Sequence, residues 1–202
     1  KKKQKMTIIQ LNLEKTLSAQ LLNGYKKSIC SDVTLVIGDQ KIQCHKFILS
    51  IWSPVLHSMV TKNWKESNSN EIIIEETEVQ GFKEMIEFFY SGTVNITNEN
   101  VIRLHQVSHK YQVDALSKEC EKFLMSTVDK KNCCFLLKYS NQYSMKELKR
   151  RSVSLILKEF PNVEKIYELD IDSLKDLIKK IDSKEGELLE EDIFNMIINW
   201  VL

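Results

Sequence analysis

Apolar residues follow two different spacings along the chain, and the change between them divides the sequence. Up to about Ile96, stretches with a period of two are mixed with stretches of helical period. From Thr97 onward only the helical spacing recurs. The pattern predicts an α+β fold class, with strands mixed among helices in the first half and an all-α segment in the second half.

The stretch from Ser31 to Ser53 contains the clearest local signals. Alternating apolar residues predict two strands, and Gly38-Asp39 supplies the tight turn between them. The spacing then lengthens to that of a helix, and Pro54 stands where another helix can begin. The apolar residues of the two strands and of the first helix are Val33, Leu35, Ile37, Ile42, Cys44, Phe47, Ile48, Ile51 and Trp52.

Weaker signals complete the first half. Residues 7–13 alternate as an extended segment, and residues 14–27 have the spacing of a helix. A strand is predicted over Ile72–Ile74 and a helix over Val79–Tyr90. Gly92 ends this helix, because glycine adopts the left-handed conformation of a helix C-cap without strain.

Helix starts recur in the second half wherever a capping residue precedes an amphipathic run. These starts lie at Thr97-Asn98, Val113-Asp114 and Val128-Asp129. Later runs keep the same spacing between short polar breaks, which predicts helices packed side by side. The later runs span residues 145–160, 163–169, 171–181 and 188–202.

Composition and charge narrow the possible functions. The net charge of +1 creates no global field for nucleic acid or an anionic membrane, and no apolar run approaches a membrane span. The five cysteines lack metal-site spacing, which favours reduced thiols in the cytoplasm or the nucleus. His105 and His109 have a spacing that suits a metal, but no third ligand accompanies them. We expect no metal, no cofactor, no nucleic-acid or membrane partner, and no enzyme activity.

Six residues between Ser31 and Ser53 follow the pattern of a known family: Asp32, Cys44, His45, Lys46, Leu49 and Ser53. In this pattern the chain resembles the BTB domain, also called POZ, with Cys44 where the family usually has alanine. GFKEMIEFFYSG and HKYQVDALSKECEKFL resemble later helices of that domain. NCCFLLKYSNQYSMKELK and ELLEEDIFNMIINWV resemble parts of the BACK domain. The resemblance implies a BTB domain over residues 1–126 and an incomplete BACK domain over residues 127–202.

The resemblance implies contacts with the N-terminal domain of cullin-3. Trp64-Lys65-Glu66 matches the hydrophobic-x-Glu motif of BTB adaptors, and a tryptophan in a polar stretch suits an exposed anchor. The alternative is that Trp64 covers its own domain. The other implied contacts, each with core packing as its alternative, are Met59, Tyr90, Leu136 and Tyr139.

Self-association is a second expected property. The N-terminal strand and helix carry more apolar surface than an isolated arm exposes, and a two-fold partner can cover it. The residues concerned are Ile9, Leu11, Leu17, Leu21 and Leu22. In the family, Asp32 and Lys46 belong to a charged pocket near the two-fold axis; the alternative is two surface charges.

Together these features imply a homodimeric, non-enzymatic substrate adaptor of a cullin-3 RING E3 ubiquitin ligase, of the type that carries kelch repeats or a MATH domain. Each protomer would hold one cullin, and a module outside this chain would capture the substrate. The alternative is a BTB oligomerisation platform that recruits a transcriptional co-repressor.

Overall fold

A computed structural model of the chain describes residues 14–62, 70–75, 78–160 and 163–182, together with four positions near the C-terminus: Phe194, Ile197, Ile198 and Trp200. The chain divides into two compact units, Lys1–Ser117 and Lys118–Leu202. We describe each unit by itself. The sequence-based domain boundary at residues 126 and 127 stays a prediction.

A small mixed sheet lies in the first unit. Strands β1 (Val33–Ile37) and β2 (Gln40–Cys44) form the predicted antiparallel hairpin, in which Gly38 has a φ of 54°. Strand β3 (Glu71–Ile73) pairs in parallel with β1, so the order is β2-β1-β3. Leu35, on the central strand, is completely buried and is paired with Ile42 and Ile72. The hairpin prediction is confirmed, and the third strand lies within one residue of its predicted position.

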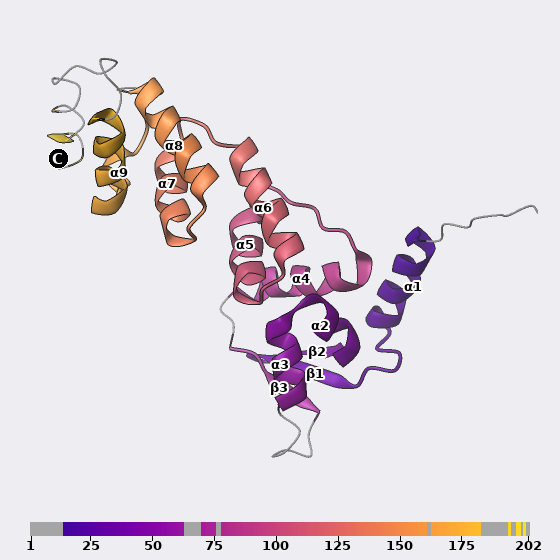
Figure 1. Cartoon of the computed structure of the whole chain (residues 1–202). Helices are drawn as coiled ribbons and strands as arrows, with labels where there is room; N and C mark the ends of the chain where they lie inside the picture. Colours follow the sequence, from indigo (N-terminus) through magenta and orange to yellow (C-terminus); the bar gives the residue numbers. More distant parts are fainter. Residues whose placement is uncertain are drawn as a thin grey trace, which may run out of the picture. The chain divides into compact units, whose positions relative to one another are not determined.

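The helices of this unit lie beside the sheet and pack against one another (Figure 1). Helix α4 has a buried apolar stripe at helical spacing that includes Phe82, Met85 and Phe89. Gly81 lets α4 approach α5 closely, because a Cβ there would stand 3.0 Å from the backbone oxygen of Arg103. The helices are α1 (Glu14–Lys26), α2 (Lys46–Trp52), α3 (Pro54–Lys62), α4 (Val79–Ser91), α5 (Val101–Lys110) and α6 (Asp114–Ser126), the last of which crosses the division between the units.

Two helix boundaries have the caps that their residues favour. The Ser53 Oγ accepts a hydrogen bond from the Leu56 N–H at 3.0 Å and donates one to the Tyr111 carbonyl at 2.6 Å. Ser53 therefore caps α3, which starts at Pro54, and ties it to the end of α5. Gly92 ends α4 in the left-handed conformation, with a φ of 68°, as predicted.

The second unit is helical. Its core contains Cys133, Cys134, Leu137, Ile156 and Leu177. The indole N–H of Trp200 donates to the Leu169 carbonyl at 2.7 Å. The segment predicted as helical over residues 163–169 forms only a short 3-10 turn. The elements are α7 (Cys133–Gln142), α8 (Lys146–Glu159), the 3-10 helix η1 (Ile166–Glu168) and α9 (Ile171–Asp182).

All five cysteines are free thiols, and all except Cys30 are buried. Burial raises the pKa of Cys44 and of Cys120 to about 12. His105 and His109 lie together, with ring centroids 5.8 Å apart, but the residues that the structure describes hold no cluster of three or more metal-ligating side chains. Within the same residues, no helix is long and apolar enough to cross a bilayer.

His105 should make stability depend on pH. Its side chain is completely buried, and burial, with a smaller contribution from His109, lowers its pKa from 6.5 to about 4. Between these values the unfolded chain binds more protons than the folded chain, so the free energy of unfolding decreases as the pH falls from 6.5 towards 4. The loss attributable to this residue should reach about 2 to 3 kcal/mol.

Urea unfolding at a series of pH values measures this loss. His105→Leu should flatten the dependence between pH 7 and 5, while His57→Gln, at an exposed position, should leave it unchanged. An equal slope in wild type and His105→Leu would contradict the assignment.

Candidate interaction surfaces

A hydrogen-bond network centred on Tyr90 joins three parts of the first unit. The Tyr90 hydroxyl lies 3.0 Å from both the backbone N–H and the Nδ1 of His45, at the start of α2. The Nε2 of His45 lies 2.7 Å from the carbonyl of Ile29, which follows α1. The Tyr25 ring of α1 stacks on Tyr90 with centroids 4.3 Å apart.

The Ile29 carbonyl at the end of this network fixes the direction of one hydrogen bond. A carbonyl only accepts hydrogen bonds, so the Nε2 of His45 carries the proton and donates to Ile29. In the neutral ring, Nδ1 then accepts from the Tyr90 O–H, while the Tyr90 oxygen accepts the His45 backbone N–H. Each polar group of the network has a partner of the correct kind. Burial also raises the pKa of Tyr90, which keeps the hydroxyl protonated.

Three of the residues that the resemblance implies as cullin contacts are buried. Tyr90 is 2%, Leu136 2% and Tyr139 4% exposed. Their positions support the alternative interpretation, core packing, and we base no partner contact on them. Met59 is half-buried on α3. Trp64 and Glu66 lie outside the described residues, between the end of α3 and the start of β3.

Helix α1 has no buried residue, although it is partly apolar. Leu17 is 58% and Leu21 39% exposed, and Leu22 is half-buried. Leu17 and Leu21 are one turn apart and share a face. Figure 1 shows α1 at one side of the unit, next to α4. Ile9 and Leu11, the other residues expected in a dimer interface, lie outside the described residues.

Two further apolar side chains are exposed on α2. Phe47 is 72% and Ile51 62% exposed, and their spacing places them on one face. The buried side of this helix instead contains Leu49, and the Trp52 indole donates to the Phe89 carbonyl at 3.0 Å. The sequence analysis assigned Phe47 and Ile51 only to the helix pattern and did not identify them as a surface. A signal was present, because a seven-residue helix with apolar residues all around cannot bury every face against one neighbour.

Asp32 and Lys46 are joined through the Lys46 backbone. The Asp32 carboxylate accepts a hydrogen bond from the Lys46 N–H at 2.8 Å, at the first turn of α2. Asp32 is exposed and Lys46 half-buried, so the pair does not bury two charges. The carboxylate stabilises the start of α2 through the helix dipole.

Comparison with known proteins shows which family this chain resembles. The BTB/POZ domain matches residues 22–128. Kelch-like protein 17 of Mus musculus is 24% identical over 177 residues, which cover 87% of this chain and 28% of that protein. Kelch-like protein 24 of Homo sapiens is 28% identical over 186 residues, covering 90% and 31% respectively. Kelch repeat and BTB domain-containing protein 12 of Homo sapiens is 26% identical over 173 residues, covering 84% and 27%. The chain therefore spans less than a third of each of these relatives.

Tyr90→Phe should destabilise the first unit, because it removes the hydroxyl while leaving the His45 N–H and Nδ1 in place. We expect a loss of about 1 to 3 kcal/mol in the free energy of unfolding, measured by urea denaturation. Tyr167→Phe removes a hydroxyl from a tyrosine that is 60% exposed and serves as the control. Equal stability of the two variants would show that the network contributes nothing.

Proposed function

The chain belongs to the BTB/POZ domain family, and from that premise we propose that it is the dimerising part of a substrate adaptor for a cullin-3 ubiquitin ligase. BTB domains mediate protein–protein interaction and dimerisation. The finer parts of the proposal are a homodimer, a cullin-3 contact after α3, and a BACK domain in the helical second unit. Recognition of the substrate would belong to a module such as the kelch repeats named in one of the relatives.

The observation that carries the proposal is the uncovered apolar face of α1. Leu17 and Leu21 expose large parts of their side chains, and no residue of the helix is buried. Apolar area loses about 25 cal/mol per Å² of free energy when it is removed from water, so a second copy of the same surface gains from covering it. A two-fold axis brings identical faces together, which makes a homodimer the simplest partner.

A second exposed apolar pair lies on α2. Phe47 and Ile51 lie on α2, whose first residues are joined to Ile29 through the His45 ring. Ile29 is itself 52% exposed. Apolar residues from α1, the following loop and α2 are thus uncovered in the same unit, which supports a large interface. Obligate dimers bury on the order of 2,000 Å² or more.

The proposed cullin contact rests on the motif Trp64-Lys65-Glu66, between α3 and β3. A tryptophan contributes a large apolar area with few rotatable bonds, which is the property of an interface anchor. In this role the chain brings a ligase and a substrate together, and the transfer of ubiquitin is the work of the recruited ligase. The proposed role therefore requires no catalytic residue in this chain.

Replacing Leu17 and Leu21 together by glutamate should convert the dimer to a monomer. Charges at the centre of an apolar interface are desolvated without partners, so the dissociation constant of the dimer should rise on the order of 100-fold or more. Sedimentation equilibrium over a range of concentrations measures it. Tyr167→Glu adds one charge at an exposed aromatic of the second unit and should leave the dimer intact. A wild-type monomer at micromolar concentration would refute the dimer.

Trp64→Ala should weaken binding of the cullin-3 N-terminal domain by about 30- to 1,000-fold, which corresponds to roughly 2 to 4 kcal/mol. Isothermal titration with purified proteins measures this change, and Tyr167→Ala is the matched aromatic control. If the wild-type dimer does not bind cullin-3, the adaptor role fails and the co-repressor platform becomes the better proposal.

A further inference from the structure

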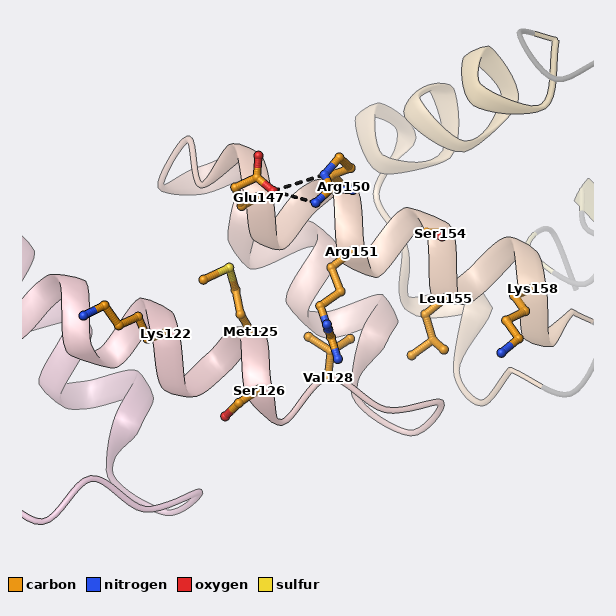
Figure 2. A pocket seen from close by; sticks show the side chains of 10 residues that line it. All are labelled: Lys122, Met125, Ser126, Val128, Glu147, Arg150, Arg151, Ser154, Leu155 and Lys158. Atoms are coloured by element: carbon orange, nitrogen blue, oxygen red, sulfur yellow. Dashed lines mark hydrogen bonds and ion pairs between the residues drawn. The ribbon is translucent and has the colours of Figure 1, made fainter.

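A groove in the second unit combines an apolar floor with a basic rim. Its volume is about 580 Å³, and it lies between the C-terminal part of α6, the chain that follows it, and α8. Figure 2 shows the side chains that line it. The floor includes Met125, Val128 and Leu155, all of them half-buried. The rim carries four cations and one carboxylate.

Two of the four cations already have a carboxylate partner. Lys122 lies 2.6 Å from Glu119, and the Arg150 guanidinium makes two hydrogen bonds to Glu147, at 3.1 and 2.8 Å. Each pair joins two residues of the same helix, α6 or α8, and is solvent-exposed, so each contributes little to stability. Arg150 and Glu147 form a neutral edge of the groove.

Arg151 and Lys158 are different. Among the residues that the structure describes, neither has a carboxylate within ion-pair distance, and both are exposed. Figure 2 shows Arg151, Leu155 and Lys158 pointing to the same side of α8, away from the Arg150–Glu147 pair. Their spacing of two helical turns separates the Cα atoms of the two residues by about 10 Å along the axis, with Leu155 between them.

The spacing of Arg151 and Lys158 and the composition of the groove lining favour one class of anionic ligand over the others. A nucleic acid would gain from aromatic side chains on which bases stack, and the lining of the groove contains none. A free phosphate would leave the apolar floor of the groove uncovered. An extended peptide of polyproline II type places residues i and i+3 on one side about 9 Å apart, and its apolar side chains can occupy the floor.

We infer that the groove binds an extended acidic peptide segment of a partner protein, with carboxylates three residues apart on Arg151 and Lys158 and an apolar side chain against Leu155. The site lies wholly within the second unit. Its lining contains none of the residues of the proposed cullin motif, Trp64-Lys65-Glu66.

Fluorescence anisotropy with labelled decapeptides tests the inference. One peptide carries two glutamates at positions i and i+3 with leucine between them; a second has the same composition with the glutamates adjacent; a third has lysines in place of the glutamates. The first should bind at least about 10-fold more tightly than the second, and the third should not bind. The affinity of the first peptide should fall as the salt concentration is raised, because both of its contacts are exposed ion pairs. Equal binding of the first two peptides, or tighter binding of a single-stranded oligonucleotide, would overturn the proposal.

Variants of the full chain locate the site. The double change Arg151→Glu and Lys158→Glu should abolish binding of the first peptide. The control, Lys130→Glu with Lys131→Glu, changes two exposed lysines outside the groove lining and should weaken binding less than about 3-fold. Ser154→Trp fills the groove without changing its charge and should also abolish binding. All variants should keep the wild-type circular dichroism and cullin-3 affinity. Binding that survives both groove variants would refute the site, and a joint loss of cullin-3 binding would show that the groove belongs to the cullin interface.

Discussion

The first unit depends on one buried hydroxyl. Tyr90 on α4 is the common partner of the His45 ring and the His45 N–H, and the ring continues the network to the Ile29 carbonyl. Three segments that are distant in sequence are therefore joined by hydrogen bonds through the Tyr90 hydroxyl and the His45 ring. Such a network stabilises one arrangement of the elements, because any shift leaves a polar group without its partner. In this arrangement, large apolar side chains of α1 and α2 remain exposed to solvent.

Local signals predicted most of the elements in this unit. The hairpin follows from alternation and a glycine turn, the start of α3 from Pro54, and the end of α4 from Gly92. Each of these depends on residues close together in the sequence, where backbone geometry decides the outcome. The parallel pairing of β3 with β1 joins residues that are far apart in the chain, and periodicity contains no information about it.

The candidate surfaces were harder to predict, since a helical apolar pattern identifies a face but not whether another element covers it. Tyr90 has the pattern and the chemistry of a contact residue and is 2% exposed; Phe47 has the pattern of a core residue and is 72% exposed. Which of the two is buried depends on packing between distant segments. The tryptophan of the hydrophobic-x-Glu motif lies outside the described residues, so its role rests on the sequence pattern.

Exposure, rather than reactivity, distinguishes the surfaces that this chain offers to partners. Four of the five thiols are buried, and burial raises the pKa of Cys44 and Cys120 to about 12, whereas large apolar side chains on α1 and α2 are in contact with water. Two neighbouring arginines of α8 also differ in what they leave available to a partner. Arg150 is neutralised within its own helix by Glu147, while the adjacent Arg151 is turned to a different side, where no described carboxylate meets it. A folded chain can leave such groups uncovered at a small cost in stability, because solvated cations and partly exposed apolar residues are tolerated at a surface. Binding then gains free energy from the apolar area that folding left in water, and the solvated cations select the charge of the ligand.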